Sequence, residues 1–141
     1  MDANEKKATV RRYYEEIWCK GNVALVDQLM TGDYENCDPA TPGGALKGQA
    51  AFKALVGTYR EAFPDLRLDI IEQHAEGDVV ISRWHASGTQ RGALMGLPPT
   101  GRHGSAIEGV TFTRFAGDRI AQDRAVWDLA GLLRQLGALP G

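Results

Sequence analysis

Apolar positions recur every three or four residues in the first half of the chain, which is the spacing of amphipathic helices. This period predicts a helix over residues 5–20, a short helix that carries Leu25 to Met30, and a third helix over residues 49–63. Pro64 ends the third helix, because proline cannot continue it. The same spacing returns after Trp127 and predicts a C-terminal helix over residues 129–136.

After Pro64 the period changes to alternation of apolar and polar residues, which is typical of half-buried strands. The alternating segments cover residues 66–70, 79–89, 105–115 and 119–127. The segment from Tyr34 to Asp38 meets Pro39, so we expect only a brief or edge strand there. Helices followed by mostly consecutive strands indicate an α+β fold with an antiparallel sheet, in one domain over residues 1–141.

Composition changes this picture only by exclusion. Sixteen basic and eighteen acidic residues leave a net charge of −2 without a basic stripe, so no nucleic-acid partner is expected. No apolar run reaches membrane-spanning length, and the polar N-terminus is unlike a signal peptide. Two cysteines and three histidines show no ligand-type spacing, so no metal is expected. These observations predict a cytoplasmic protein.

The last two strands meet at Gly117-Asp118, where glycine in the first turn position favours a tight type II′ hairpin. In that register Ala116 faces Arg119, Phe112 faces Asp123, and Glu108 faces Trp127. Directly opposed residues share a sheet face. Asp123 therefore lies among small and aromatic residues that suit a cavity wall. A slip of one residue would swap the two faces.

Several short motifs follow one another in a distinctive order: Phe63-Pro64-Asp65, Gly77-Asp78-Val79-Val80, Ser87-Gly88-Thr89, Pro98-Pro99-Thr100-Gly101, Gly117 to Ile120, and Asp128 to Gly137. Together they resemble the SnoaL-like polyketide cyclase (ester cyclase) family of the nuclear-transport-factor-2-like superfamily. The resemblance implies a cone-shaped curved antiparallel sheet, wrapped by N-terminal helices around one apolar pocket and often found in a homodimer. It also implies intramolecular aldol chemistry on a polycyclic carbonyl substrate, without metal or cofactor.

In characterised relatives an aspartate on a late strand acts as general acid/base, and this role maps onto Asp123. Burial would raise its pKa toward working pH and let it remove a C–H proton next to carbonyl groups. The alternative is a structural ion pair with Arg114, diagonally across the hairpin. His103, in a glycine-rich loop, is a second catalytic candidate if that loop lies at the pocket mouth; otherwise it is a solvated histidine.

The expected substrate is a small apolar or aromatic molecule. Trp84, Phe112 and Trp127 are the candidates for its apolar walls, and Tyr14 is a candidate oxygen donor. The chain departs from relatives that often carry histidine at the position of Cys37. Other functions therefore stay open: a cofactor-independent hydroxylase or epoxide hydrolase in the same pocket, or a non-catalytic small-ligand-binding module.

Overall fold

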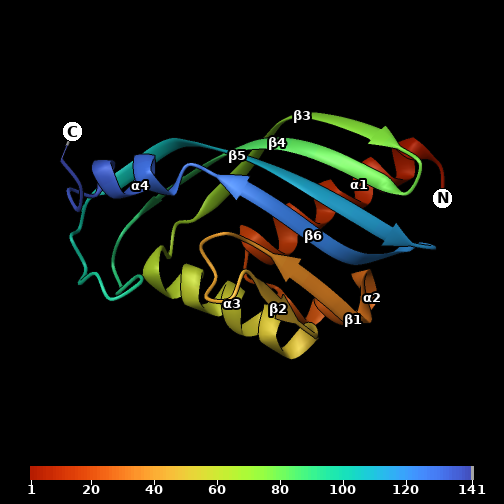
Figure 1. Ribbon diagram of the computed structural model, residues 1–141, viewed down its shortest axis with the longest axis horizontal. Helices are drawn as coiled ribbons and strands as arrows, with labels where there is room; N and C mark the ends of the chain where they lie inside the picture. Colours follow the sequence, from red (N-terminus) through yellow and green to blue (C-terminus); the bar gives the residue numbers. More distant parts are fainter. Residues whose placement is uncertain (141) are drawn as a thin grey trace.

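The computed structural model describes residues 1–140. Its centre is a curved six-stranded sheet (Figure 1). The strand order is β2-β1-β6-β5-β4-β3. The bounds are β1 Met30–Cys37, β2 Ala45–Lys47, β3 Arg67–Glu76, β4 Val79–Thr89, β5 His103–Ala116 and β6 Arg119–Trp127. Four of the five pairings are antiparallel, and β1 runs parallel to β6. The α+β class is confirmed, with a sheet that is mixed and not closed.

The helices leave one face of the sheet free. They are α1 Ala3–Tyr13, the π-helix η1 Tyr14–Trp18, the 3-10 helix η2 Val23–Leu25, α2 Val26–Leu29, α3 Gln49–Ala62 and α4 Leu129–Gln135. Helix α1 packs on β3 and β4, α3 packs on β1 and β2, and α4 packs on β5. Asp2 and Glu5 form a capping box that starts α1, and the Asp128 carboxylate caps α4 by accepting from the Gly131 amide at 2.8 Å.

Strand β1 is not the edge strand that Pro39 suggested. The three-residue strand β2 pairs with its free side, so that β1 lies inside the sheet between β2 and β6. Proline follows β1 only after its last ladder residue, Cys37, so no ladder hydrogen bond is lost. A strand as short as β2 leaves no alternation in the sequence to be recognised.

The buried residues form two clusters on the helix side of the sheet. The larger lies beneath α1 and α3 and includes Tyr13, Tyr34 and Phe52, while the smaller surrounds α4 and includes Leu132 and Leu136. Three partly buried side chains pack against both clusters: Trp18, Ala86 and Trp127. The boundary between the clusters is where the cavity of the protein lies.

The predicted hairpin register holds at the turn and fails beyond it. Ala116 pairs with Arg119 as expected, and Gly117 has a φ of 64°. The register then shifts because Ala121 is an extra residue on β6, a β-bulge. Thr113 rather than Phe112 therefore pairs with Asp123. A slip of one residue turns the whole of β5 over, so Phe112 faces away from the helices and is 44% exposed.

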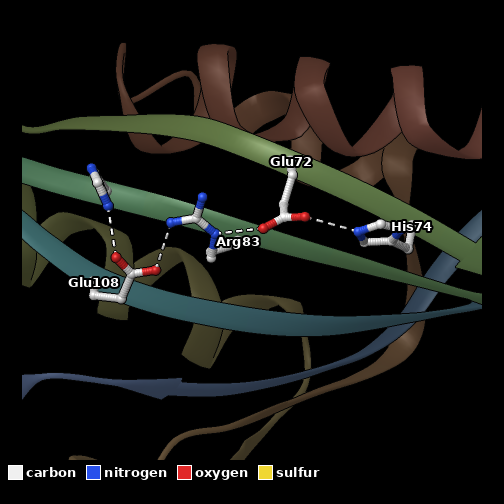
Figure 2. A network of polar contacts seen from close by, with 5 residues as sticks. Glu72, His74, Arg83 and Glu108 are labelled. Carbon is white, nitrogen blue, oxygen red and sulfur yellow. Dashed lines mark hydrogen bonds and ion pairs between the residues drawn. The ribbon is translucent and has the colours of Figure 1, made fainter.

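The opposite face of the sheet carries charged side chains, as Figure 2 shows for Glu72, His74, Arg83 and Glu108. The Arg83 guanidinium donates to Glu72 Oε1 at 2.7 Å and to Glu108 Oε1 at 3.0 Å. Glu108, predicted to share the face of Asp123, thus lies on the outer face through the same register shift. Exposed ion pairs of this kind contribute little to stability.

One close approach in the sheet is testable. Gly109 on β5 lies under the Trp84 ring, and a Cβ there would overlap the ring carbons. We expect Gly109→Ala to lower the free energy of unfolding by about 1–3 kcal/mol, measured by urea denaturation. The matched control is Gly57→Ala on the exposed side of α3, where no atom lies within 4 Å and helix propensity favours alanine. Equal stability of Gly109→Ala and the native protein would contradict this packing.

Candidate active site

A cavity lies between the inner face of the sheet and the helices. Its volume is about 110 Å³, on a scale where one water needs roughly 10–15 Å³. It is therefore large enough for a small ligand and is more than a packing defect. Most of its wall is apolar, and aromatic rings from both sides contribute to it, including Trp18, Tyr59, Trp84 and Trp127. Apolar walls with a few polar groups are typical of ligand sites.

The Asp123 carboxylate lies in the wall of this cavity and is only 1% exposed. Three hydroxyl groups donate to it. Tyr13 and Tyr34 donate to Oδ2 at 2.9 and 2.6 Å, and Thr113 donates to Oδ1 at 2.6 Å. The donors come from α1, β1 and β5, so that three elements distant in sequence converge on one side chain of β6.

A second layer of donors fixes the direction of these hydrogen bonds. The Trp18 indole donates to Tyr13 Oη at 3.1 Å, and the Asn36 amide donates to Tyr34 Oη at 3.1 Å. Each tyrosine oxygen therefore accepts one hydrogen bond and gives its own proton to Asp123. Hydrogen bonds in such chains polarise one another, which strengthens the stabilisation of negative charge on the carboxylate.

Burial and hydrogen bonding act on Asp123 in opposite directions. Burial raises the pKa of Asp123, while the hydrogen bonds from Thr113, Tyr34 and Tyr13 lower it, and burial prevails. The pKa values of Tyr13 and Tyr34 lie well above their usual range, first because the rings are buried and then because Asp123 is close. The site thus holds a carboxylate with a raised pKa beside hydroxyls that stay protonated.

The π-helix η1 brings consecutive tyrosines into the site. Its wider turn closes with the Cys19 amide donating to the Tyr14 carbonyl at 3.0 Å. Tyr13, Tyr14 and Trp18 all line the cavity as a result. π-Helical turns are frequent at functional sites because they shift side chains around the helix. Burial, followed by the Asp123 charge, raises the pKa of Tyr14, so its hydroxyl remains a neutral hydrogen-bond donor.

The structure brings together Asp123, Tyr14, Trp84 and Trp127, four of the residues singled out in the sequence. The Trp84 indole donates to Thr111 Oγ1 at 2.9 Å, and the Trp127 indole donates to both oxygens of Asp38 at 3.1 Å. These hydrogen bonds from the indole N–H groups fix the orientations of both rings. Their roles toward a substrate remain predictions.

Two predicted site residues lie elsewhere. Phe112 is on the outer face of β5 and does not line the cavity. His103 is exposed at the start of β5, where its Nδ1 lies 2.9 Å from Thr89 Oγ1, and it does not line the cavity either. The glycine-rich loop before β5 ends with its histidine turned toward Thr89, so no contact with Asp123 supports a catalytic role for His103.

The predicted ion pair between Arg114 and Asp123 is wrong. The bulge places Arg114 on the outer face, where its guanidinium donates to Asp78 Oδ1 at 2.9 Å. Asp123 has no ionic partner among residues 1–140 and is stabilised by neutral donors alone. An uncompensated buried carboxylate is a common feature of sites that move protons.

Several residues of the site were missed in the sequence. Tyr34, Asn36 and Asp38 alternate at strand spacing. Strand β1 places Tyr34 against Asp123 and Asn36 in the cavity wall, and Asp38, just beyond β1, also lines the cavity. This alternation is the only sign of these residues in the sequence. It indicates a site only when β1 is known to pair with β6, which places this segment beside Asp123. Tyr13 is not distinguished from Tyr14, because both tyrosines lie on the same apolar stripe of the helix. Thr113 is missed because the hairpin register without the bulge directs its side chain to the outer face.

The described residues contain no group of three or more His, Cys, Asp or Glu side chains arranged to hold a metal ion. Within the same residues, no helix is long and apolar enough to cross a membrane.

The model of the SnoaL-like polyketide cyclase family matches residues 8–136. The chain belongs to this family. No curated protein sequence matches it. A proposed polyketide cyclase from Acidithiobacillus ferrooxidans is a similar solved structure, with 29% identity, a TM-score of 0.86, and coverage of 97% of this chain and 98% of the other.

Two Streptomyces structures are also similar to the chain. TsrD from Streptomyces laurentii has 26% identity and a TM-score of 0.86, and 99% of each chain is covered. AclR from Streptomyces galilaeus, a proposed hydroxylase, has 26% identity and a TM-score of 0.84, with coverage of 99% of this chain and 100% of AclR. Proteins described as cyclase and as hydroxylase thus share this fold, so membership of the family leaves the reaction open.

The opposition of burial and hydrogen bonding predicts how Asp123 titrates. We expect Tyr34→Phe to raise the pKa of Asp123 further, because it removes a donor that lowers it. Carboxyl ¹³C NMR of the labelled protein measures this, and Thr113→Val is the second variant. Tyr59→Phe is the control, because Tyr59 does not bond to Asp123.

The sign of the stability effect follows from the same shift. The pKa of Asp123 is higher in the folded than in the unfolded protein, so folding favours the protonated form. Its contribution to stability is therefore present below the unfolded pKa and is lost as pH rises through the folded pKa.

For the NMR titrations, an unchanged or lower Asp123 pKa in both Tyr34→Phe and Thr113→Val would contradict the lowering effect of these hydrogen bonds.

Proposed function

We propose that the protein is a cofactor-free acid/base enzyme that acts on a small carbonyl compound, with Asp123 as the base. The observation that carries this is a carboxylate with a raised pKa and no ionic partner, in the wall of an apolar cavity. A base works best when its pKa approaches the working pH. Membership of the SnoaL-like polyketide cyclase family supports the same chemistry.

The oxygen we assign to proton transfer is Asp123 Oδ1. Oδ2 already accepts from two tyrosines, whereas Oδ1 accepts only from Thr113. A carboxylate oxygen accepts about two hydrogen bonds, so Oδ1 retains a free lone pair for a substrate proton. The hydrogen bonds of Tyr13, Tyr34 and Thr113 hold the carboxylate plane still, which fixes the direction of that lone pair.

In the proposed reaction, Asp123 removes a proton from a carbon next to a carbonyl group. The electron pair of that C–H bond forms an enolate, whose carbon attacks a second carbonyl carbon of the same molecule. The new C–C bond leaves an alkoxide, and Asp123 returns its proton to this oxygen. No water or oxidant is consumed. We assign to Tyr14, whose hydroxyl stays protonated and which lines the cavity, the role of donor to the enolate oxygen.

The walls of the cavity supply the remaining assistance. Trp84 and Trp127 are held by hydrogen bonds at the edges of their rings, which leaves the ring faces free to contact a planar substrate. Holding both carbonyl groups against these surfaces makes ring closure intramolecular in a favourable geometry. The apolar surroundings exclude water, which strengthens the hydrogen bonds to the developing charge.

A second candidate function is hydroxylation or hydrolysis in the same cavity. Asn36 pairs directly with Asp123 across β1 and β6, and both side chains line the cavity. Their oxygens could together orient a water molecule. The similarity to AclR, a proposed hydroxylase, also favours this candidate. A need for dioxygen, or a diol formed from an epoxide, would separate it from aldol chemistry.

The homodimer implied by the resemblance stays a prediction. Phe112 and Val126 are 44% and 59% exposed on the outer face of the sheet, which supports burial of this face against a second copy. Light scattering on the purified protein measures the oligomeric state.

Proton abstraction can be tested before the natural substrate is known. The native protein should accelerate deuterium exchange at the acidic carbons of β-tetralone, a neutral bicyclic ketone, as followed by NMR in heavy water. Asp123→Asn should lower this rate by about 10²–10⁴-fold, because the amide cannot accept the proton. Chemical-shift changes should show that the variant still binds the ketone.

The matched control is Asp78→Asn, which removes an exposed carboxylate that pairs with Arg114 outside the cavity. We expect it to exchange deuterium at the native rate. An Asp123→Asn variant as active as the native protein would overturn the proposed function.

A further inference from the structure

The cavity contains a second carboxylate, Asp38, and no positively charged side chain. Asp38 follows β1 and is half-buried in the cavity wall. Of the described residues that line the cavity, none is Lys, Arg or His. No cationic side chain among these described residues therefore neutralises the negative charge of Asp38 within the cavity. The proposed aldol mechanism gives this carboxylate no role.

Asp38 has one acceptor position left for a ligand. Its Oδ1 accepts from the Ala40 amide at 2.8 Å and from the Trp127 indole at 3.1 Å, while Oδ2 accepts only from the same indole. Since a carboxylate oxygen accepts about two hydrogen bonds, Oδ2 can accept one more. The bond from the Ala40 amide stabilises the turn after β1 through Oδ1, and it leaves the second acceptor position of Oδ2 open.

A chain of aromatic rings begins at Trp127, the ring that donates to this carboxylate. Tyr59 lies edge-on to Trp127 with ring centroids 6.4 Å apart, and Trp18 lies edge-on to Tyr59 at 6.1 Å. All three rings line the cavity. After burial, the Asp38 charge is the second cause that raises the pKa of Tyr59, which places the carboxylate close to that ring. Aromatic faces attract cations, and a nearby carboxylate adds to this attraction.

Asn36 adds a further acceptor to the same cavity. Asn36 is 6% exposed and lines the cavity, and its amide nitrogen donates to Tyr34. No group in residues 1–140 donates to its side-chain carbonyl oxygen. Because Asn36 lines the cavity, this oxygen is accessible from it and can accept a hydrogen bond from a ligand or from water. Asn36, Asp38 and Asp123 thus make the polar part of the cavity rich in acceptors.

We propose that Asp38, with Trp127, Tyr59 and Trp18, binds an ammonium group, so that the ligand of this cavity is an amine in its protonated or quaternary form. Asp38 lies two residues beyond Asn36, the strand partner of Asp123. As a statement about the substrate, this inference rests on the proposed function, and it then specifies a carbonyl compound that also carries an ammonium group.

The test compares choline with its neutral carbon isostere, in which a tert-butyl group replaces trimethylammonium. Titrations followed by the indole N–H resonances at low salt give both affinities. The native protein should bind choline about tenfold more tightly than the isostere, because only the cation gains from the carboxylate and the rings. In Asp38→Asn, which keeps an acceptor for Ala40 and Trp127, the ratio should fall several-fold, to the smaller preference that the aromatic rings alone provide.

Asp78→Asn is again the control and should keep the native ratio, because that carboxylate lies outside the cavity. Equal binding of both ligands to the native protein, or an unchanged ratio in Asp38→Asn, would overturn the inference. A parallel loss of both ligands in Asp38→Asn would also overturn it, because Asp38 would then only orient Trp127. Deuterium exchange into β-tetralone needs no cation, so its outcome decides the role of Asp123 separately.

Discussion

The hydrogen bonding of three hydroxyl groups to the Asp123 carboxylate is the interaction on which this structure depends. A buried carboxylate without partners would cost several kcal/mol, and neutral donors from α1, β1 and β5 reduce that cost without removing the charge. The same contacts join the N-terminal helix to the centre of the sheet. Stability and chemistry are therefore linked at one side chain, because the groups that make its burial tolerable also tune its pKa.

Much of the fold could be predicted from the sequence, because its signals are local. The helical period, the alternation of the late strands, and the turn at Gly117 each depend on residues close in the chain. The inward direction of Asp123 follows from alternation with Ala125 and Trp127 within β6. The bulge at Ala121 has no comparable signal, so the face of β5 was inverted and Phe112 was assigned in place of Thr113.

The remaining site residues depend on long-range pairing. Tyr34 and Asn36 reach Asp123 only because β1 runs parallel to β6, and nothing within residues 30–37 indicates that partner. Family membership supplies the fold, and proteins described as cyclase and as hydroxylase share that fold, so it leaves the reaction open. What this chain does with the fold therefore depends on its own polar side chains, chiefly Asp123 in the depth of the cavity and Asp38 beside its aromatic wall.

If the buried Asp123 carboxylate is itself the base, the rate of exchange must follow its ionisation. The decisive measurement compares the pH dependence of deuterium exchange catalysed by the native protein with the ¹³C titration of Asp123 in the same buffer. We expect the rate to rise with pH through a midpoint equal to the pKa of Asp123, above the ordinary aspartate value of about 3.9. A rate that does not change across this titration would contradict it.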